Sequence, residues 1–324
     1  MNTNYFLNEL FEKQLISDQQ KAQIEAFENT RPMSVHWELR ALLYAGIVLF
    51  TSGIGIFIYQ NIDSISHDVL IGLLALITAI CFWHVLRQAQ PFSEQEAAAP
   101  PQLADFVLLL GCLLFLALEG YVQYQYNLFG KRYGLATAIP AVFFLFLAYR
   151  FDHRGVLSMA LTALASWVGL SVAPLQILKN DFGNPPLIYT AVVFSVLAIG
   201  TALFLDSRNF KKHFTYTYLL LLGNLFFVAA LAGLFSMETK GLFFVPFIAA
   251  ACFVFMRYAR AEQSFLFLLM AVLYGYIAFT NVFYKLFDWN NEWAISLVYL
   301  YFIISAVGVV WFFLNYRKLL GMKS

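Results

Sequence analysis

Long apolar stretches separated by short polar connections dominate the hydropathy pattern of this chain. As helices, such stretches are long enough to cross the hydrocarbon core of a bilayer, which takes about 20 apolar residues. The pattern therefore predicts an all-α, polytopic integral membrane helix bundle with ten transmembrane helices. The ten predicted spans are 39–60, 67–88, 103–125, 132–149, 155–173, 186–205, 214–235, 241–258, 264–287 and 294–316.

Composition points the same way. Of the 324 residues, 61% are hydrophobic and 12% are charged, whereas soluble domains carry about 25% charged residues. A soluble fold of this size has too little interior to hide so much apolar surface, so the lipid bilayer is the expected partner. The net charge of +1 gives no reason to expect nucleic acid.

The first 36 residues are the only polar stretch long enough to form a separate piece. Apolar residues within 6–11 recur at three- and four-residue spacing, which predicts one helix. Ser17 and Gln20 then have the spacing of a capping box, in which each side chain satisfies a backbone N–H of the other residue. We expect a small cytoplasmic helical hairpin, which is too small to fold alone and would dock on the bundle or on lipid headgroups.

Domain organisation follows from these segments. Pro91, Pro100, Pro101 and a run of three alanines make the connection after the second span read as a flexible spacer. The predicted parts are the hairpin (1–36), the first two transmembrane helices (37–88), a cytoplasmic linker (89–102), an eight-helix transmembrane region (103–318) and a cytoplasmic tail (319–324).

Lysine and arginine are unevenly distributed between the two sides of the predicted bundle. With the N-terminus inside, the residues on the outside are Lys131, Arg132, Lys179, Lys240 and Lys285, and the remaining fifteen of the 20 lie on the cytoplasmic side. Cytoplasmic loops carry such an excess. We therefore expect the bacterial inner membrane, with both termini in the cytoplasm.

Glu119 is the residue that most needs an explanation. The apolar run Phe106–Leu118 that precedes it covers only about 20 Å of a roughly 30 Å core as a helix. Extending the span at its outer end places Glu119 inside the membrane, whereas extending it at the inner end submerges Asp105. Burying an unpaired carboxylate in the bilayer costs free energy. Glu119 should therefore be protonated, be paired with another group or lie next to a water-filled cavity.

Asp105, Cys112, Glu119 and Gln123 fall within a sector of roughly 40° on a helical wheel, and this stripe should face protein. One interpretation is a proton or cation site, or the gate of a substrate path. The other is a hydrogen-bonded structural carboxyl near a polar outer cap.

Two amides also lie deep in predicted spans: Asn224 in the seventh and Asn281 in the ninth. Buried amides commonly join helices by hydrogen bonds, and a substrate site is the alternative. We expect no metal, because no two histidines have the spacing of a metal site on one helix. We expect no cofactor, because no phosphate- or dinucleotide-binding glycine motif occurs. The sequence shows no nucleophile and general base at a recognisable spacing, which disfavours an enzyme.

Three short motifs carry a resemblance to a known family: residues 15–20 (LISDQQ), 42–46 (LLYAG) and 53–63 (GIGIFIYQNID). They resemble the bacterial predicted-membrane-protein family called domain of unknown function 2157, over roughly the first 90 residues. The resemblance implies a polytopic inner-membrane protein with a cytoplasmic N-terminal domain, and it implies no activity.

Two functions remain open at this point. The first is a transporter-like or small-ligand-binding helix bundle that uses Glu119 to couple, gate or bind an ion or small molecule. The alternative is a membrane sensor or scaffold whose hairpin at residues 1–36 recruits a cytoplasmic protein partner.

Overall fold

A computed structural model describes residues 17, 19–21, 23–24, 36–60, 66–96, 102–130, 132, 134–174, 177, 179, 181–286 and 292–322. The chain divides into two units, residues 1–54 and residues 55–324, and each is considered by itself. Throughout the described residues the regular structure is helical, so the predicted all-α fold is confirmed.

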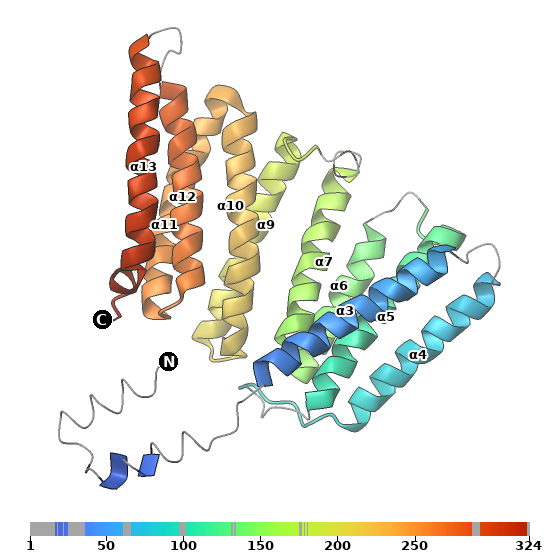
Figure 1. Cartoon of the computed structure of the whole chain (residues 1–324). Helices are drawn as coiled ribbons and strands as arrows, with labels where there is room; N and C mark the ends of the chain where they lie inside the picture. Colours follow the sequence, from blue (N-terminus) through green and yellow to red (C-terminus); the bar gives the residue numbers. More distant parts are fainter. Residues whose placement is uncertain are drawn as a thin grey trace. The chain divides into compact units, whose positions relative to one another are not determined.

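Each of the ten predicted spans overlaps one α-helix (Figure 1). The helices are α3 (His36–Gln60), α4 (His67–Arg87), α5 (Gln102–Tyr126), α6 (Leu135–Phe151), α7 (Arg154–Val172), α9 (Pro185–Ser207), α10 (Thr215–Ser236), α11 (Phe244–Ala261), α12 (Phe265–Leu286) and α13 (Glu292–Leu319), with 3-10 turns η1 (Lys212–Phe214) and η2 (Glu238–Phe243). Among the described residues, eight helices are long and apolar enough to cross a membrane, and Ala41–Phe57 and Leu135–Phe151 are shorter apolar helices.

Consecutive helices of the second unit pack as hairpins: α4 with α5, α6 with α7, α9 with α10, and α11 with α12 (Figure 1). Further contacts join the hairpins, because α5 touches α6 and α7, α7 touches α9 and α10, and α10 touches α11 and α12. We call the end at which α4, α6 and α9 finish and α5, α7 and α10 begin the linker end.

The core lies in two clusters of apolar side chains, one around α5, α6 and α7 and one around α10, α11 and α12. Helix α10 contributes to both clusters. The absence of a side chain at Gly223 lets the Phe255 ring of α11 lie against the α10 backbone, where a Cβ would overlap the ring. Many large apolar side chains elsewhere are exposed on the helix surfaces, as expected where lipid is the solvent.

The described part of the first unit contains the predicted capping box. The Ser17 backbone N–H donates to Gln20 Oε1 (3.0 Å), and the Gln20 N–H donates to Ser17 Oγ (3.3 Å). These two bonds confirm the predicted helix start. The first helix of the predicted hairpin, within residues 6–11, lies outside the described residues.

Candidate functional site

Glu119 lies on α5, toward the end opposite the linker end. Its Oε1 atom is buried, and within the described part of the chain it has no hydrogen-bond partner. Buried polar atoms are nearly always hydrogen-bonded, and leaving one unsatisfied costs about 1–3 kcal/mol. Glu119 therefore stands out as a carboxyl group whose binding capacity the described protein does not use.

Gln123, one turn beyond Glu119, has a structural role. Its Oε1 accepts the Phe129 backbone N–H (2.9 Å), and its Nε2 donates to Asn127 Oδ1 (3.3 Å). The side chain thus fastens the loop that follows α5 onto the last turn of the helix. Cys112, in the middle of the stripe, is 0% exposed, so there the stripe faces protein.

The same end of the molecule has polar contacts between α4 and α5. The Tyr126 hydroxyl donates to Asp68 Oδ1 (2.5 Å), and the Tyr121 hydroxyl lies 2.7 Å from His67 Nδ1. Both bonds join the first turn of α4 to the last turns of α5. Tyr121 and Tyr126, which follow Glu119, therefore link α5 to α4.

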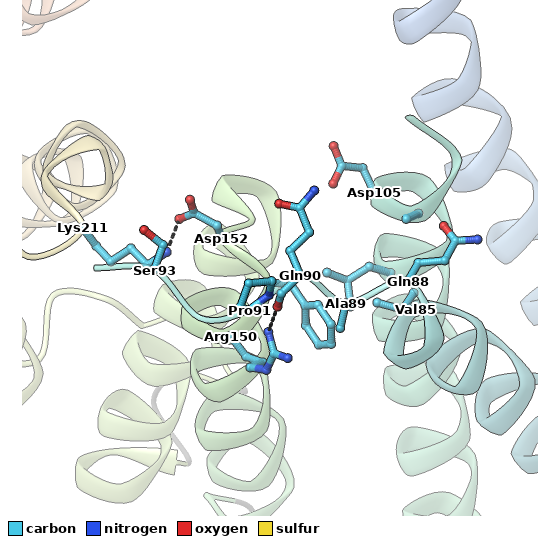
Figure 2. Close-up of a pocket in the computed structure, with 13 residues that line it drawn as sticks. Val85, Gln88, Ala89, Gln90, Pro91, Ser93, Asp105, Arg150, Asp152 and Lys211 are labelled. Atoms are coloured by element: carbon cyan, nitrogen blue, oxygen red, sulfur yellow. Dashed lines mark hydrogen bonds and ion pairs between the residues drawn. The ribbon is translucent and has the colours of Figure 1, made fainter. Parts of the chain in front are cut away.

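Asp105 lies at the linker end, fourteen residues and about 21 Å along α5 from Glu119. It lines a cavity of about 40 Å³ with Arg150, Asp152 and Lys211 and with residues of the linker (Figure 2). Arg150 donates from Nη1 to the Gln90 carbonyl oxygen (2.8 Å). The cavity has room for at least one water molecule among polar partners.

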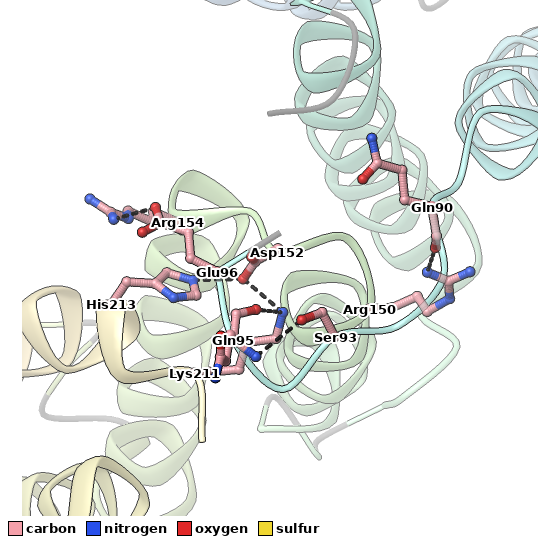
Figure 3. Close-up of polar contacts among 9 residues, drawn as sticks. All are labelled: Gln90, Ser93, Gln95, Glu96, Arg150, Asp152, Arg154, Lys211 and His213. Carbon is pink, nitrogen blue, oxygen red and sulfur yellow. Dashed lines mark hydrogen bonds and ion pairs between the residues drawn. The ribbon is translucent and has the colours of Figure 1, made fainter. Parts of the chain in front are cut away.

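A buried charged group adjoins this cavity (Figure 3). Asp152 Oδ1 lies 2.9 Å from Lys211 Nζ and 2.6 Å from His213 Nε2, and all three side chains are buried. Asp152 ends α6, whereas Lys211 and His213 precede α10. The group therefore fastens the α6–α7 hairpin to the α9–α10 hairpin at the linker end.

The backbone at both ends of this ion pair is left-handed: φ is 57° at Asp152 and 47° at Lys211. That region is sparsely populated by residues other than glycine and costs roughly 1–3 kcal/mol per residue. At Asp152 this conformation is the C-terminal cap of α6, in which the Asp152 backbone N–H donates to the Ala148 carbonyl oxygen.

The linker packs against the same group. The Lys211 backbone N–H donates to the Glu94 carbonyl oxygen (2.7 Å), and its Nζ donates to the Gln95 carbonyl oxygen (3.5 Å). Arg154 and Glu96 add an exposed ion pair at 2.8 Å. Residues 90–96 of the expected flexible linker are held by these contacts across the ends of α6, α7 and η1. The three alanines, Pro100 and Pro101, on which that prediction also rested, lie outside the described residues.

His153 connects the cluster to α5. Its Nδ1 accepts the Val156 backbone N–H (3.0 Å) and so caps the start of α7. Burial lowers the pKa of the His153 ring below its ordinary 6.5, and the nearby Asp105 carboxylate opposes that shift. Because Nδ1 accepts a hydrogen bond, it carries no proton in this arrangement.

The two amides behave differently. Asn224 accepts the Tyr274 hydroxyl at Oδ1 (2.7 Å) and donates from Nδ2 to the Leu220 carbonyl oxygen (2.6 Å), so it joins α10 to α12. Asn281 Oδ1 is buried and, among the described residues, has no partner. Hydrogen bonding accounts for Asn224 and leaves Asn281 without an explanation.

The structure does not gather the five predicted site residues into one place. Asp105 is at the linker end, whereas Glu119 and Gln123 are toward the other end of α5. Asn224 and Asn281 belong to α10 and α12, and neither helix has a strong contact with α5. In the described ranges, no group of three His, Cys, Asp or Glu side chains could hold a metal ion.

A second, larger cavity of about 470 Å³ lies between α7, α9 and α10. Apolar side chains make most of its wall, and no charged residue lines it within the described part of the chain. Sequence analysis missed this cavity and the Asp152–Lys211 pair. The one available signal for the pair was an aspartate and a histidine in the short turn between two spans.

Residues 8–157 match the model of a family described as "Predicted membrane protein (DUF2157)". The resemblance read from the motifs is thereby confirmed for the N-terminal part. The match includes Asp105, Glu119 and Asp152, and it ends before Lys211 and before α9 to α13. No curated protein and no solved structure matches the chain.

Proposed function

We propose, on the premise that residues 8–157 match a family of predicted membrane proteins, that the chain binds a proton or a small cation at Glu119 within its helix bundle. The observation that carries this proposal is the buried Oε1 atom without a partner in the described protein. A transporter-like or small-ligand-binding role follows if the site exchanges its ligand with water.

The ligand class follows from electrostatics. A charged carboxylate is expensive in a low-dielectric interior, so the group stays neutral or takes a positive partner. Proton binding removes the charge, and a metal cation or an ammonium group compensates it. An anionic ligand would add repulsion to the desolvation cost.

Helix α5 carries one carboxyl group at the linker end and another toward its opposite end. Buried apolar side chains lie between the two. Asp105 lines the cavity at the linker end, whereas Leu108, Cys112 and Leu114 are almost fully buried. These apolar side chains separate Asp105 from Glu119 on the same helix. We propose that exchange at Glu119 takes place from the end opposite the linker end unless the bundle rearranges.

We propose the bacterial inner membrane as the location, with the linker end in the cytoplasm. The basis is the concentration of lysine and arginine at this end, which includes Arg87, Arg150, Arg154, Lys211 and Lys212. Segments rich in these residues stay on the cytoplasmic side.

Labelling with a hydrophobic carbodiimide tests the proposal, because this reagent modifies protonated carboxyl groups within a bilayer. We expect mass spectrometry of the full chain in lipid nanodiscs to find the label on Glu119 and to find less label as pH rises. A cation that binds there should protect Glu119 from the reagent. Asp68 serves as the internal control for labelling of a carboxyl group that already has a hydrogen-bond partner, because it accepts the Tyr126 hydroxyl.

The contradicting outcome is a Glu119 that stays unlabelled at every pH while other carboxyl groups react. Reconstituted vesicles separate binding from transport. If the unaltered protein is labelled at Glu119 and protected there by a cation, but Glu119→Gln leaves proton and cation flux unchanged, Glu119 binds its ligand without transporting it.

A second candidate function is recruitment of a cytoplasmic protein by residues 1–36. The supporting observation is the capping box of Ser17 and Gln20, which shows a defined helix start in this polar segment. Deleting residues 1–36 and comparing the proteins that co-purify tests this function. Identical sets of co-purifying proteins would count against it.

A further inference from the structure

The cavity between α7, α9 and α10 has no part in the proposed function. It has a volume of about 470 Å³, which lies within the range of small-molecule sites, roughly 300–1,000 Å³. Small residues on all three helices create the space, among them Ala165, Gly169, Ala191 and Ala229. It is separate from Glu119, which lies on α5.

Three side-chain hydroxyls of the wall are already hydrogen-bonded. Thr137 Oγ1 donates to the Gly134 carbonyl oxygen, Ser166 Oγ to that of Thr162, and Thr190 Oγ1 to that of Pro186, at 2.7–3.0 Å. Each hydroxyl is thus satisfied within its own helix. These three hydroxyl groups therefore have no spare proton to donate to a ligand, and water beside them would find few partners.

The cavity opens on the lipid-facing surface. Phe182 and Val228 are part of its wall, and each is 55% exposed. Val228 lies near the middle of α10, which is long and apolar enough to cross a membrane. Around such a residue the surrounding medium is hydrocarbon, so an apolar chain can enter from the side.

The cavity also runs along the helices. On α9 its wall extends from Leu187 to Phe194, which is about 10 Å as a helix. Leu187 lies in the first turn of α9 and Phe194 lies two turns deeper. The space therefore begins near the helix ends, where lipid headgroups lie, and continues toward the bilayer centre.

We propose that this cavity binds one hydrocarbon chain of a bilayer phospholipid, with the headgroup near Phe182 and the chain directed along α9 toward Phe194. The uncharged wall, the satisfied hydroxyls, the lateral opening and the depth all suit this occupant. Water in this cavity would make few hydrogen bonds, whereas a hydrocarbon chain needs none.

A phosphatidylcholine with a photoreactive diazirine in its acyl chain tests the site. The full chain is placed in nanodiscs that contain this lipid, irradiated, and analysed by peptide mass spectrometry. We expect adducts to concentrate on residues 187–194 of α9 and 225–232 of α10. Evenly spread adducts on every lipid-facing helix would overturn the proposal.

Two filling variants and one control make the result specific. Ala191→Phe on α9 and Ala165→Phe on α7 place a ring in the cavity, and we expect adducts there to fall on the order of tenfold, equivalent to ~1.4 kcal/mol. Val196→Phe lies on the exposed surface of α9 outside the cavity and should keep the adducts.

Thermal unfolding in the same nanodiscs shows which filling variant folds, and a folded one is sufficient. If neither folds, Ala191→Leu provides a smaller filling residue for the same measurement. A folded filling variant that keeps the full adduct level at 187–194 would overturn the proposal.

Discussion

Lys211 Nζ lies 2.9 Å from Asp152 Oδ1, and both side chains are buried although both residues lie in turns at the linker end. This ion pair joins the turn between α6 and α7 to the turn before α10. Both residues have positive φ values, so the pair coincides with strained backbone on each side. The contact therefore fastens the two hairpins to each other at the linker end.

Removing the ammonium should destabilise the protein strongly. Lys211→Met leaves the buried Asp152 carboxylate without the ammonium and with His213 Nε2 as its neighbour, and breaking a buried ion pair costs about 3–5 kcal/mol. The adjacent Lys212 is exposed, so Lys212→Met should change the free energy of unfolding by about 0.5 kcal/mol or less. Thermal unfolding of the two variants in detergent measures the difference. Equal unfolding temperatures would show that the pair does not stabilise the linker end.

Protonation of His153 should destabilise the fold in acid. Burial lowers the ring's pKa from 6.5 in the folded chain, so below about pH 6.5 the unfolded chain binds more protons than the folded chain. The free energy of unfolding therefore falls as pH drops through this range and toward the folded pKa. Asp105 opposes the shift and limits its size.

The variant His153→Asn keeps an acceptor at the start of α7, since asparagine is a favoured N-cap residue, and it cannot titrate. We expect a weaker loss of stability on acidification than in the unaltered protein. His153→Ala, without an acceptor, should lose about 1 kcal/mol at neutral pH. An unchanged pH profile in His153→Asn would assign the acid sensitivity to another group.

The ten helices could be predicted because the length of an apolar run is a local property. Bilayer thickness determines how long each run must be, and turn residues determine where it ends. The Ser17–Gln20 capping box is equally local, and its two hydrogen bonds are present. Such features need no knowledge of the partner helices.

The linker-end cluster could not be predicted because its contacts are non-local and partly made by the backbone. Asp152 and Lys211 are 59 residues apart and read as ordinary loop charges. The carbonyl oxygens of Gln90, Glu94 and Gln95 hold the linker, and every residue type has a carbonyl. Such contacts leave no pattern in the sequence, so the ordered backbone at residues 90–96 could not be predicted from composition.

Glu119 should be more valuable for binding than for stability. Replacing it with Met removes the desolvation cost of an unsatisfied carboxyl, so we expect the free energy of unfolding to rise by about 1–3 kcal/mol. Gln123→Met is the matched control, because it removes the acceptor of the Phe129 N–H and should destabilise by about 1 kcal/mol. Unfolding temperatures in detergent compare the two variants. A clearly destabilised Glu119→Met would indicate that the carboxyl has a structural role.

The two amides provide a second contrast between a bonded and an unbonded polar group. Tyr274→Phe removes the donor to Asn224 Oδ1, and interhelical hydrogen bonds in membranes are worth about 0.6–2 kcal/mol. Asn281→Leu on the same helix removes an amide whose Oδ1 is buried and, in the described protein, unbonded. That change should be neutral or stabilising, because the leucine has no polar atom to desolvate. Thermal unfolding of both variants provides the measurement. A destabilised Asn281→Leu would show instead that this amide contributes to the stability of the fold.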